Sequence, residues 1–292
     1  MPILLAAIAV LGVSASGPLM AATAAPALAI AFWRNAAGAT LIAPFALTRN
    51  QSELRELDRQ SLLKCGLAGL LLAAHFAAWV SALKLTSVAA ATALVTTQLI
   101  WIVLIDRFAG MRPSRAVLAG SALSIAGVLV ISGFDFSVST RAITGDLLAI
   151  GGGLFAALYL VTGNDLRRTL STTSYTFVCY GVCAFSLAVA AVIGGIPFAG
   201  YSRKSWLLIA AVTISAQLLG HSLLNHLLAV MSPMVISLAL LLEVPGAALL
   251  AGVFLGQSPP WGVYAGLVLI LLGLAVVATR RQGTTENIVL AE

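Results

Sequence analysis

Long apolar runs dominate the hydropathy pattern of this chain, and short stretches with glycine, proline or charged residues separate them. Each run is close to the roughly 20 residues that a helix needs to cross the hydrocarbon core of a bilayer. The pattern therefore predicts an all-α integral membrane protein with ten transmembrane helices. The predicted ranges are 3–20, 29–48, 62–83, 87–106, 115–133, 144–164, 174–194, 205–230, 233–255 and 260–279.

The composition argues against a water-soluble protein. Hydrophobic residues make up 60% of the 292 residues, charged residues only 9%, and the mean hydropathy is +1.04. A soluble domain carries roughly a quarter charged residues, so DNA-binding proteins, disordered scaffolds and soluble enzymes are disfavoured. The first 30 residues have the apolar and alanine-rich character of a secretory signal, but no basic residue precedes Arg34. We therefore expect the first helix to be retained.

The charged residues predict a topology. The net charge is +6, and the 16 Lys and Arg residues lie between apolar segments rather than in a nucleic-acid-binding patch. With the N-terminus in the cytoplasm, eleven cations fall on the cytoplasmic side and five on the outer side, which satisfies the positive-inside rule. The cytoplasmic set is Arg49, Arg55, Arg59, Lys64, Arg107, Arg112, Arg115, Arg167, Arg168, Arg280 and Arg281, and the outer set is Arg34, Lys84, Arg141, Arg203 and Lys204. Both termini are predicted to be cytoplasmic.

The sequence contains a weak internal repeat. Helices 87–106 and 115–133 align with helices 233–255 and 260–279, so that Ser87 matches Ser232 and Leu104 matches Leu249, with one single-residue gap before Gly127 and Gly273. The repeat divides the chain into a first half, 1–140, a second half, 141–281, and a cytoplasmic tail, 282–292. Because five crossings is an odd number, the second half must be inverted relative to the first. Inverted repeats around a central cavity are a common architecture of secondary transporters.

Two polar side chains occupy equivalent midplane positions in this alignment. Gln98 lies in the middle of helix 87–106, and Glu243 lies in the middle of helix 233–255. Because ionisable and polar groups are costly in hydrocarbon, they are candidate substrate contacts. A hydrogen bond between helices, with Glu243 protonated, explains them equally well.

Further candidates lie on two other helices. Gln217, His221 and Asn225 follow one another at four-residue spacing, which predicts a polar stripe on one face of helix 205–230. Pore lining is the favoured explanation for this stripe, and bonding between helices is the alternative. His75 near the middle of helix 62–83 fits either a substrate contact or a packing role.

The aromatic residues and Arg34 divide between the membrane interface and the interior. Trp33, Trp79, Trp206 and Trp261 lie near predicted outer ends, where an aromatic belt explains them. Arg34, beside Trp33, is interpreted as interfacial. Trp101 is deeper, one turn from Gln98, and an aromatic wall beside polar groups suits an organic solute. Tyr159 is a weaker candidate for the same cavity.

Several motifs are missing from the sequence. It contains no Walker motif, HExxH, CxxC or potassium-channel filter, so no cofactor, metal or ATP-driven chemistry is predicted. Cys65, Cys179 and Cys183 are interpreted as small core residues. A membrane-embedded enzyme acting on a lipid is disfavoured, because it would need an acid, base or metal clustered at one membrane interface. A structural or assembly protein is disfavoured because it would not need the polar stripe on helix 205–230. Composition and spacing thus favour a small-solute transporter, with membrane lipid as its surroundings, no nucleic-acid partner, and a monomeric or homodimeric state.

The chain resembles the drug/metabolite transporter superfamily, in its EamA-like, ten-helix branch. The resemblance covers nearly the whole chain and is carried by Phe32-Trp33-Arg34, by the two half-ends aligned above, and by the stretch from Gly145-Asp146 to Tyr159. Some positions depart from the family pattern: Leu11-Gly12 stands where Trp-Gly is common, and Met111-Arg112 and Gly256-Gln257 stand where Gly-Glu is common.

Within that superfamily the sequence is most similar to the YddG-type bacterial amino acid exporters. The similarity implies export of amino acids, aromatic ones among them, across a bacterial inner membrane by alternating access, with other metabolites and drugs as the alternative cargo. On this basis Gln98, His221 and Asn225 are expected to hydrogen-bond a zwitterion, as His75 also could, and Glu243 to be its charged partner. Trp101 and Tyr159 are expected to contact its side chain.

Overall fold

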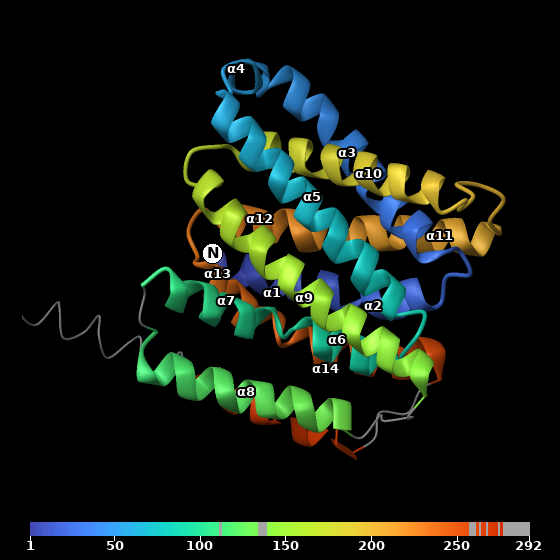
Figure 1. The fold of residues 1–292 in the computed structure, drawn as a ribbon, viewed down its shortest axis with the longest axis vertical. Coiled ribbons are helices and arrows are strands. Elements are labelled where there is room, and N and C mark those ends of the chain that lie inside the picture. Colours follow the sequence, from blue (N-terminus) through green and yellow to red (C-terminus); the bar gives the residue numbers. More distant parts are fainter. Residues whose placement is uncertain are drawn as a thin grey trace, which may run out of the picture.

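The computed structural model describes residues 1–110, 113–133, 139–256, 261–262, 264–266, 268–273 and 275–276. In these residues every regular element is a helix and none is a strand (Figure 1). The helices are α1 (Pro2–Ser14), α2 (Ser16–Ala21), α3 (Ala27–Thr48), α4 (Gln51–Arg55), α5 (Arg59–Ala82), α6 (Val88–Val95), α7 (Gln98–Phe108), α8 (Arg115–Gly133), α9 (Thr140–Leu166), α10 (Thr172–Ile193), α11 (Arg203–Val212), η1 (Thr213–Ser222), α12 (Leu223–Leu227), α13 (Pro233–Leu240) and α14 (Glu243–Leu255).

The helices coincide with the apolar runs of the sequence. Among the described residues, seven helical stretches are long and apolar enough to cross a membrane: Pro2–Ala21, Arg59–Ala82, Val88–Phe108, Thr140–Leu166, Thr172–Ile193, Arg203–Leu227 and Pro233–Leu255. Helix α3 is also 22 residues long, but it carries Arg34 and Asn35 in its first half. The last predicted segment, 260–279, lies partly outside the described residues.

Serine and aspartate side chains fix where many of these helices begin. Each accepts a hydrogen bond from the backbone N–H three residues further on, which satisfies one of the free donors at a helix N-terminus. Such a cap is worth about 0.5–2 kcal/mol, so short polar connections are enough to define the helix starts. The capping residues are Asp58, Ser87, Ser139, Ser171, Ser202 and Ser232.

Two of the predicted helices, 87–106 and 233–255, are broken in the middle. The N–H groups of Thr96 and Thr97 bond to carbonyls three residues back rather than four, and those of Leu241 and Leu242 do the same. In the first break, the hydroxyl groups of the two threonines compete for the same carbonyls, at 2.6 and 2.7 Å. In the second, Pro245 lacks the N–H that would continue the regular ladder. Gln98 and Glu243 are therefore the first residues of separate half-helices, α7 and α14.

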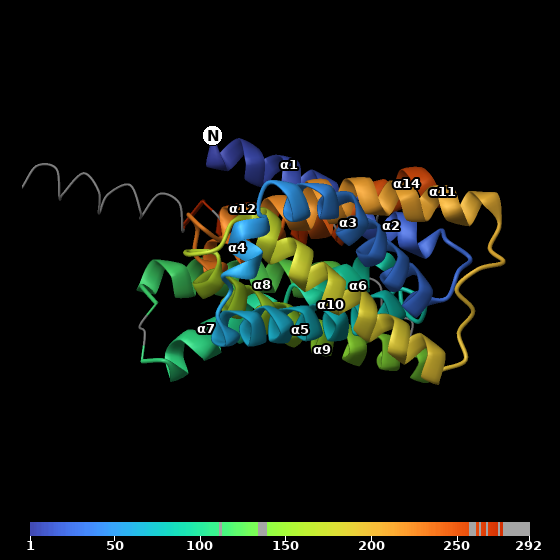
Figure 2. The same cartoon turned by 90° about the horizontal axis from the view of Figure 1, so that it is seen from above.

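The helices form two packed groups around the interior. Helix α5 packs along α9, and α1 packs along η1. In Figure 2 the α5–α9 pair lies on one side of the molecule, and α1 with α11 lies on the other. Between them the broken helices cross: α6 packs against α14, and α7 packs against α13. The two breaks are thus brought to the centre of the bundle.

Helix α8 lies at the edge of the bundle beside the segment 264–273 (Figure 1). Glycines permit the contact: a Cβ on Gly127 would stand 2.5 Å from the carbonyl oxygen of Gly266, and one on Gly273 would stand 2.1 Å from Oγ of Ser124. Small residues at such crossings let helix backbones approach closely in lipid, where apolar burial alone gives little driving force.

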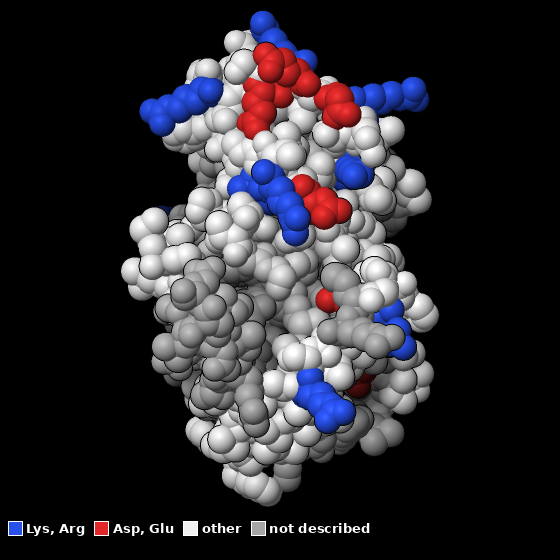
Figure 3. Space-filling model, turned by 90° about the vertical axis from the view of Figure 1, so that its left-hand side faces the viewer, with Lys and Arg blue, Asp and Glu red and all other residues white. Residues whose placement is uncertain are grey.

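The connections 49–58, 109–110, 167–171 and 228–232 lie at one end of the helices, on the left in Figure 1. Figure 3 views this end, where Lys, Arg, Asp and Glu side chains gather. Arg49, Arg55, Arg59 and Lys64 are all exposed there. Charged groups therefore concentrate where the chain leaves the apolar helices, as a membrane protein requires.

Candidate functional site

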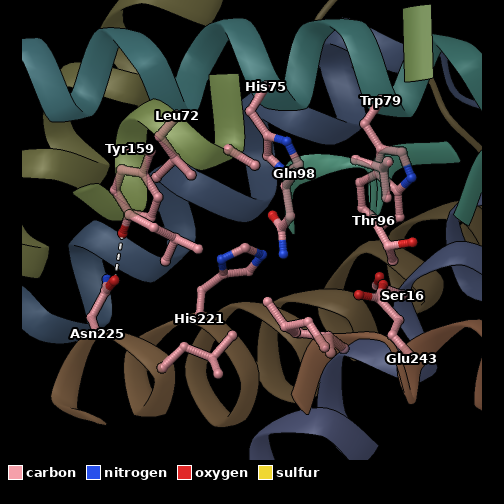
Figure 4. A pocket seen from close by; sticks show the side chains of 16 residues that line it. Ser16, Leu72, His75, Trp79, Thr96, Gln98, Tyr159, His221, Asn225 and Glu243 are labelled. Atoms are coloured by element: carbon pink, nitrogen blue, oxygen red, sulfur yellow. Dashed lines mark hydrogen bonds between the residues drawn. The ribbon is translucent and has the colours of Figure 1, made fainter. Parts of the chain in front are cut away.

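A cavity lies at the centre of the bundle, where the two broken helices cross (Figure 4). Its wall is formed by α1, α2, α5, α9, η1 and α12 together with the breaks in α6–α7 and α13–α14. Ligand-binding pockets are mostly apolar with a few polar groups. This cavity has that character: six apolar aliphatic side chains alternate with tryptophan, tyrosine, histidine, amide, hydroxyl and carboxyl groups, and one alanine completes the wall.

Six of the seven residues expected at the site line this cavity. They are His75, Gln98, Tyr159, His221, Asn225 and Glu243. The seventh, Trp101, packs against the core outside the cavity wall, and its indole Nε1 is buried without a hydrogen-bond partner in the described part of the chain. Trp79, which the sequence assigned to an interfacial belt, lines the cavity instead, because α5 turns this face toward α9 and not toward the bilayer.

The imidazole of His75 is oriented by the backbone of α9. Its Nδ1 lies 3.0 Å from the carbonyl oxygen of Gly152. A carbonyl only accepts, so Nδ1 carries the proton, and in the neutral ring Nε2 remains an acceptor. The ring stacks on Trp79, with centroids 5.8 Å apart, and lies 6.3 Å from the ring of His221. Two imidazoles from opposite sides of the bundle therefore face the same space.

Tyr159 and Asn225 form a hydrogen bond at one end of the cavity. The Tyr159 hydroxyl donates to Oδ1 of Asn225 over 2.6 Å, as drawn in Figure 4. Nδ2 of Asn225 is buried and has no partner in the residues described. Behind it, Nε of Arg167 donates to the Asn225 backbone carbonyl over 2.8 Å. Asn225 thus offers an unused amide donor from a rigidly held position.

Gln98 and Glu243 reach into the cavity from the starts of α7 and α14 (Figure 4). They are 6% and 8% exposed, and within the described residues neither side chain has a hydrogen-bond partner. Glu243 is the only carboxyl group in the cavity wall among the residues that the structure describes. A carboxyl group and an amide without hydrogen-bond partners in a buried pocket are costly unless a ligand uses them.

The predicted three-residue stripe on helix 205–230 is split. His221 and Asn225 line the cavity, but Gln217 is buried in the layer behind it. The reason is that Thr213–Ser222 forms a π-helix, whose hydrogen bonds span five residues, so four-residue spacing no longer stacks side chains as it does in an α-helix. Gln217 instead bonds between helices, with Nε2 donating to Oδ1 of Asn35 over 2.9 Å.

Arg34 is the charged residue that sequence reasoning misplaced. It is not interfacial but fully buried, with 0% exposure. Its Nε donates to Oε1 of Gln217 over 2.8 Å, and its guanidinium carbon lies 4.2 Å from the centre of the Phe76 ring. Nη2 has no partner within the described residues. The neighbouring buried Asn35 was the available sequence signal, because two adjacent polar residues in an apolar helix indicate an interior polar layer.

A second polar network joins two connections at the charged end of the molecule. Glu53 of α4 accepts hydrogen bonds from the backbone N–H of Ser171 over 2.6 Å and from the hydroxyls of Ser171 and Ser174 at the start of α10. Partial burial raises the pKa of Glu53, but these hydrogen bonds lower it by more, so its pKa lies below the ordinary value. The network ties the connection after α3 to the start of α10.

The cysteines are free and buried, in keeping with small core residues. In the parts of the chain that the structure describes, no three His, Cys, Asp or Glu residues gather as metal ligands would. Helices of membrane-spanning length, two breaks at the centre and a polar cavity between them define a multi-pass membrane transporter.

Comparison with known proteins gives the family. The sequence model of the EamA-like transporter family matches residues 1–133 and 143–279, so the chain belongs to this family, which is part of the drug/metabolite transporter superfamily. An uncharacterized transporter, YxxF, of Bacillus subtilis (strain 168) is 26% identical over 250 residues, which cover 84% of this chain and 79% of that protein. A crystal structure with 22% sequence identity matches the fold with a TM-score of 0.76, over 94% of this chain and 96% of that one.

Proposed function

We propose that this protein exports small organic zwitterions, amino acids with apolar or aromatic side chains, by alternating access between two inverted five-helix halves. The observation that carries the proposal is the central cavity, with one carboxyl group, several neutral hydrogen-bonding groups and two aromatic residues, Trp79 and Tyr159, in the described part of its wall. The family gives the transporter class, and the chemistry of this cavity supports the choice of substrate.

The cavity wall supports the inverted-repeat arrangement. Most of its residues fall into pairs from the two halves, each pair separated by 143 to 146 positions in the sequence. An approximate twofold axis through the cavity would produce such pairs, because it exchanges equivalent helices. The pairs are Val13 and Ala156, Ser16 and Tyr159, His75 and His221, Trp79 and Asn225, Val95 and Leu240, and Gln98 and Glu243.

Helix packing supports the same symmetry. Exchanging the halves turns the contact of α6 with α14 into that of α13 with α7, and both contacts are present. It also turns α1 against η1 into α9 against α5, and again both are present. Consecutive membrane-length helices run in alternating directions (Figure 1), so α1 and α9 start at opposite ends. The family model matches two stretches that flank the proposed boundary near residue 140.

The Glu243 carboxyl group favours a substrate with an ammonium group. Glu243 is the only carboxyl group in the described part of the cavity wall, and Arg34 and Arg167 are both buried. A zwitterion offers an ammonium group to Glu243 without adding net charge to the interior, where an added charge is costly. Its ammonium group fits Glu243, and its side chain fits against Trp79, which lies at the same end of the cavity as Glu243 in Figure 4, while Tyr159 lies at the other end. Trp79 thus takes the role that the sequence suggested for Trp101.

We place the protein in a bacterial inner membrane, with the charged end of Figure 3 and both termini in the cytoplasm. The exposed arginines at that end support this orientation through the positive-inside rule. A phosphatase fusion placed in the 194–202 connection should be active, and one placed in the 167–171 connection inactive. The reverse pattern contradicts the orientation while leaving the transport proposal intact.

The proposed function is tested by flux through liposomes. Purified protein should move labelled phenylalanine down its gradient without converting it, and unlabelled phenylalanine should compete better than a quaternary ammonium drug. His221→Ala and Glu243→Gln should reduce the flux at least about tenfold if each supplies one hydrogen bond or ion pair to the substrate. Thr40→Ala is a matched control, because the Thr40 hydroxyl is exposed and bonds only to its own helix.

Three outcomes contradict the proposal. Stronger competition by the quaternary ammonium drug would indicate a drug exporter. A modified product would indicate an enzyme. Normal flux in both cavity variants would remove the cavity from the transport path.

A further inference from the structure

The half-helices α7 and α14 both begin at the cavity, and they differ in the residue at their first position. Helix α14 has an acidic residue, Glu243, in its first turn, whereas α7 has none and starts with Gln98 at the pseudo-equivalent position. In the break before α7, the N–H groups of Leu99 and Ile100 bond to the carbonyls of Thr96 and Thr97. The backbone at the start of α7 is therefore largely satisfied, and a donor for an anion there must come from a side chain. The protein places a carboxyl group at the start of α14 and an amide at the start of α7.

The side chain of Gln98 is a second, independent sign of a ligand at α7. It is 6% exposed and reaches into the cavity, and its amide has no hydrogen-bond partner within the described residues. Thr96, directly before it, also lines the cavity, and its hydroxyl is already used in a bond to the Ala93 carbonyl. The amide Nε2 of Gln98 is therefore the free side-chain donor at the start of α7.

We propose that the start of α7, with the Gln98 amide, is the subsite for the carboxylate of the substrate, while the Glu243 carboxylate binds the ammonium group. The inference rests on the proposed function and adds which end of the amino acid binds where. Bound in this way, the carboxylate of the substrate lies beside the Gln98 amide, and the carboxylate of the chain, Glu243, lies at the start of α14.

This arrangement explains how the cavity distinguishes an amino acid from the corresponding amine. Phenethylamine carries the ammonium group and the aromatic ring of phenylalanine but no carboxylate. It can contact Glu243, but it leaves Gln98 and the start of α7 without an anion and adds a positive charge to the interior. The wild-type protein should therefore prefer phenylalanine over phenethylamine by about 10- to 100-fold in half-saturating concentration, the range expected for one charge-assisted contact.

The test exchanges the chemistry at position 98. Gln98→Glu places a carboxylate at the start of α7, where it should repel the carboxylate of phenylalanine and attract a cation. We expect phenylalanine transport to fall at least tenfold and phenethylamine transport to be kept or increased, so that the preference reverses. Gln98→Met, which has a similar volume and no donor, should reduce phenylalanine transport without any gain for phenethylamine. Retained phenethylamine flux shows that the Gln98→Glu protein is folded and inserted.

Rescue provides a separate check. In the double variant Gln98→Glu with Glu243→Gln, the single carboxylate sits at α7, and the start of α14 is free for the substrate carboxylate. Phenylalanine transport should recover relative to Gln98→Glu alone. Absence of any recovery, in a protein that still carries phenethylamine, overturns the pairing of the two helix ends.

The outcomes separate this inference from the proposed function. If the wild-type protein carries phenylalanine and Gln98→Glu keeps the wild-type preference, the carboxylate subsite is wrong and the amino acid carrier stands. If the wild-type protein carries neither phenylalanine nor phenethylamine, the proposed function itself fails.

Discussion

Substitution of Gly153 tests whether the break in helix 88–108 is built into the packing. Gly153 of α9 faces this break, and a Cβ there would stand 2.7 Å from the carbonyl oxygen of Val95, 2.8 Å from Oγ1 of Thr97 and 3.1 Å from the backbone nitrogen of Gln98. The closest contact is with backbone, which cannot move aside as a flexible side chain can. At Gly151, two residues away on the same helix, a Cβ meets nothing within 4 Å.

The two positions form a matched pair. Replacing glycine by alanine inside a helix gains about 0.5–1 kcal/mol from reduced backbone entropy, and this gain applies equally to both sites. Overpacking at a tight contact costs about 1–3 kcal/mol. Because the helix term cancels between the two variants, Gly153→Ala should be less stable than Gly151→Ala by about 1–3 kcal/mol.

The free cysteines provide the assay. Cys65, Cys179 and Cys183 are buried, so a thiol-reactive fluorescent dye labels them as the helices separate on heating. The Gly153→Ala protein should be labelled at a temperature several degrees lower than Gly151→Ala, which should match or exceed the wild type. Equal thermal-unfolding midpoints for the two variants would show that α9 does not pack tightly against the break, and would refute the close contact described above.

Three further predictions concern the polar networks. Glu53→Gln should lower the thermal midpoint at pH 7 by the equivalent of about 1 kcal/mol, a value reduced for partial exposure. Since the folded-state pKa of Glu53 lies below its ordinary value of 4.5, its stabilisation is present above pH 4.5 and is lost as the pH falls through the folded-state value, so the two midpoints should converge in acid; a constant gap contradicts this. Tyr159→Phe removes the donor to Asn225 and should cost about 1–3 kcal/mol and slow transport, whereas unchanged stability would mean that Asn225 finds another donor. Arg34→Lys keeps the charge but loses the planar fork that binds Gln217, and should lower stability by about 1–3 kcal/mol; a wild-type midpoint would show that charge alone matters.

The positions of the helices could be predicted because they follow from local composition. A run of about 20 apolar residues is stable in the bilayer, and there its backbone groups can bond only to one another, which requires a helix; the apolar runs therefore predict the helix ranges. The start of each helix is also local, as the cap formed by Ser232 shows. The breaks were not predicted, because threonine pairs and a proline inside an apolar run are compatible with an unbroken or kinked helix.

Sequence analysis located candidate-site residues correctly where a polar residue lies in the middle of an apolar helix, because such a side chain must face the interior of the protein. Gln98, Glu243 and His75 are of this kind, and all three line the cavity. Trp79 and Arg34 were assigned to the interface because each lies near the end of a helix, where aromatic and basic residues are common. Depth along the helix is a weak guide there, since it does not tell which face of the helix meets its neighbours.

By itself, the sequence determined the membrane location, the helix ranges and the concentration of charge at one end, because hydropathy and capping act over a few residues. Tertiary structure alone decided that α7 and α14 start at a shared cavity, that Gln217 turns away from it with Arg34, and that Trp79 takes the place expected for Trp101. These depend on the rotation of each helix about its axis and on how closely its neighbours approach. Both are set by packing between segments far apart in the chain, which no local pattern encodes.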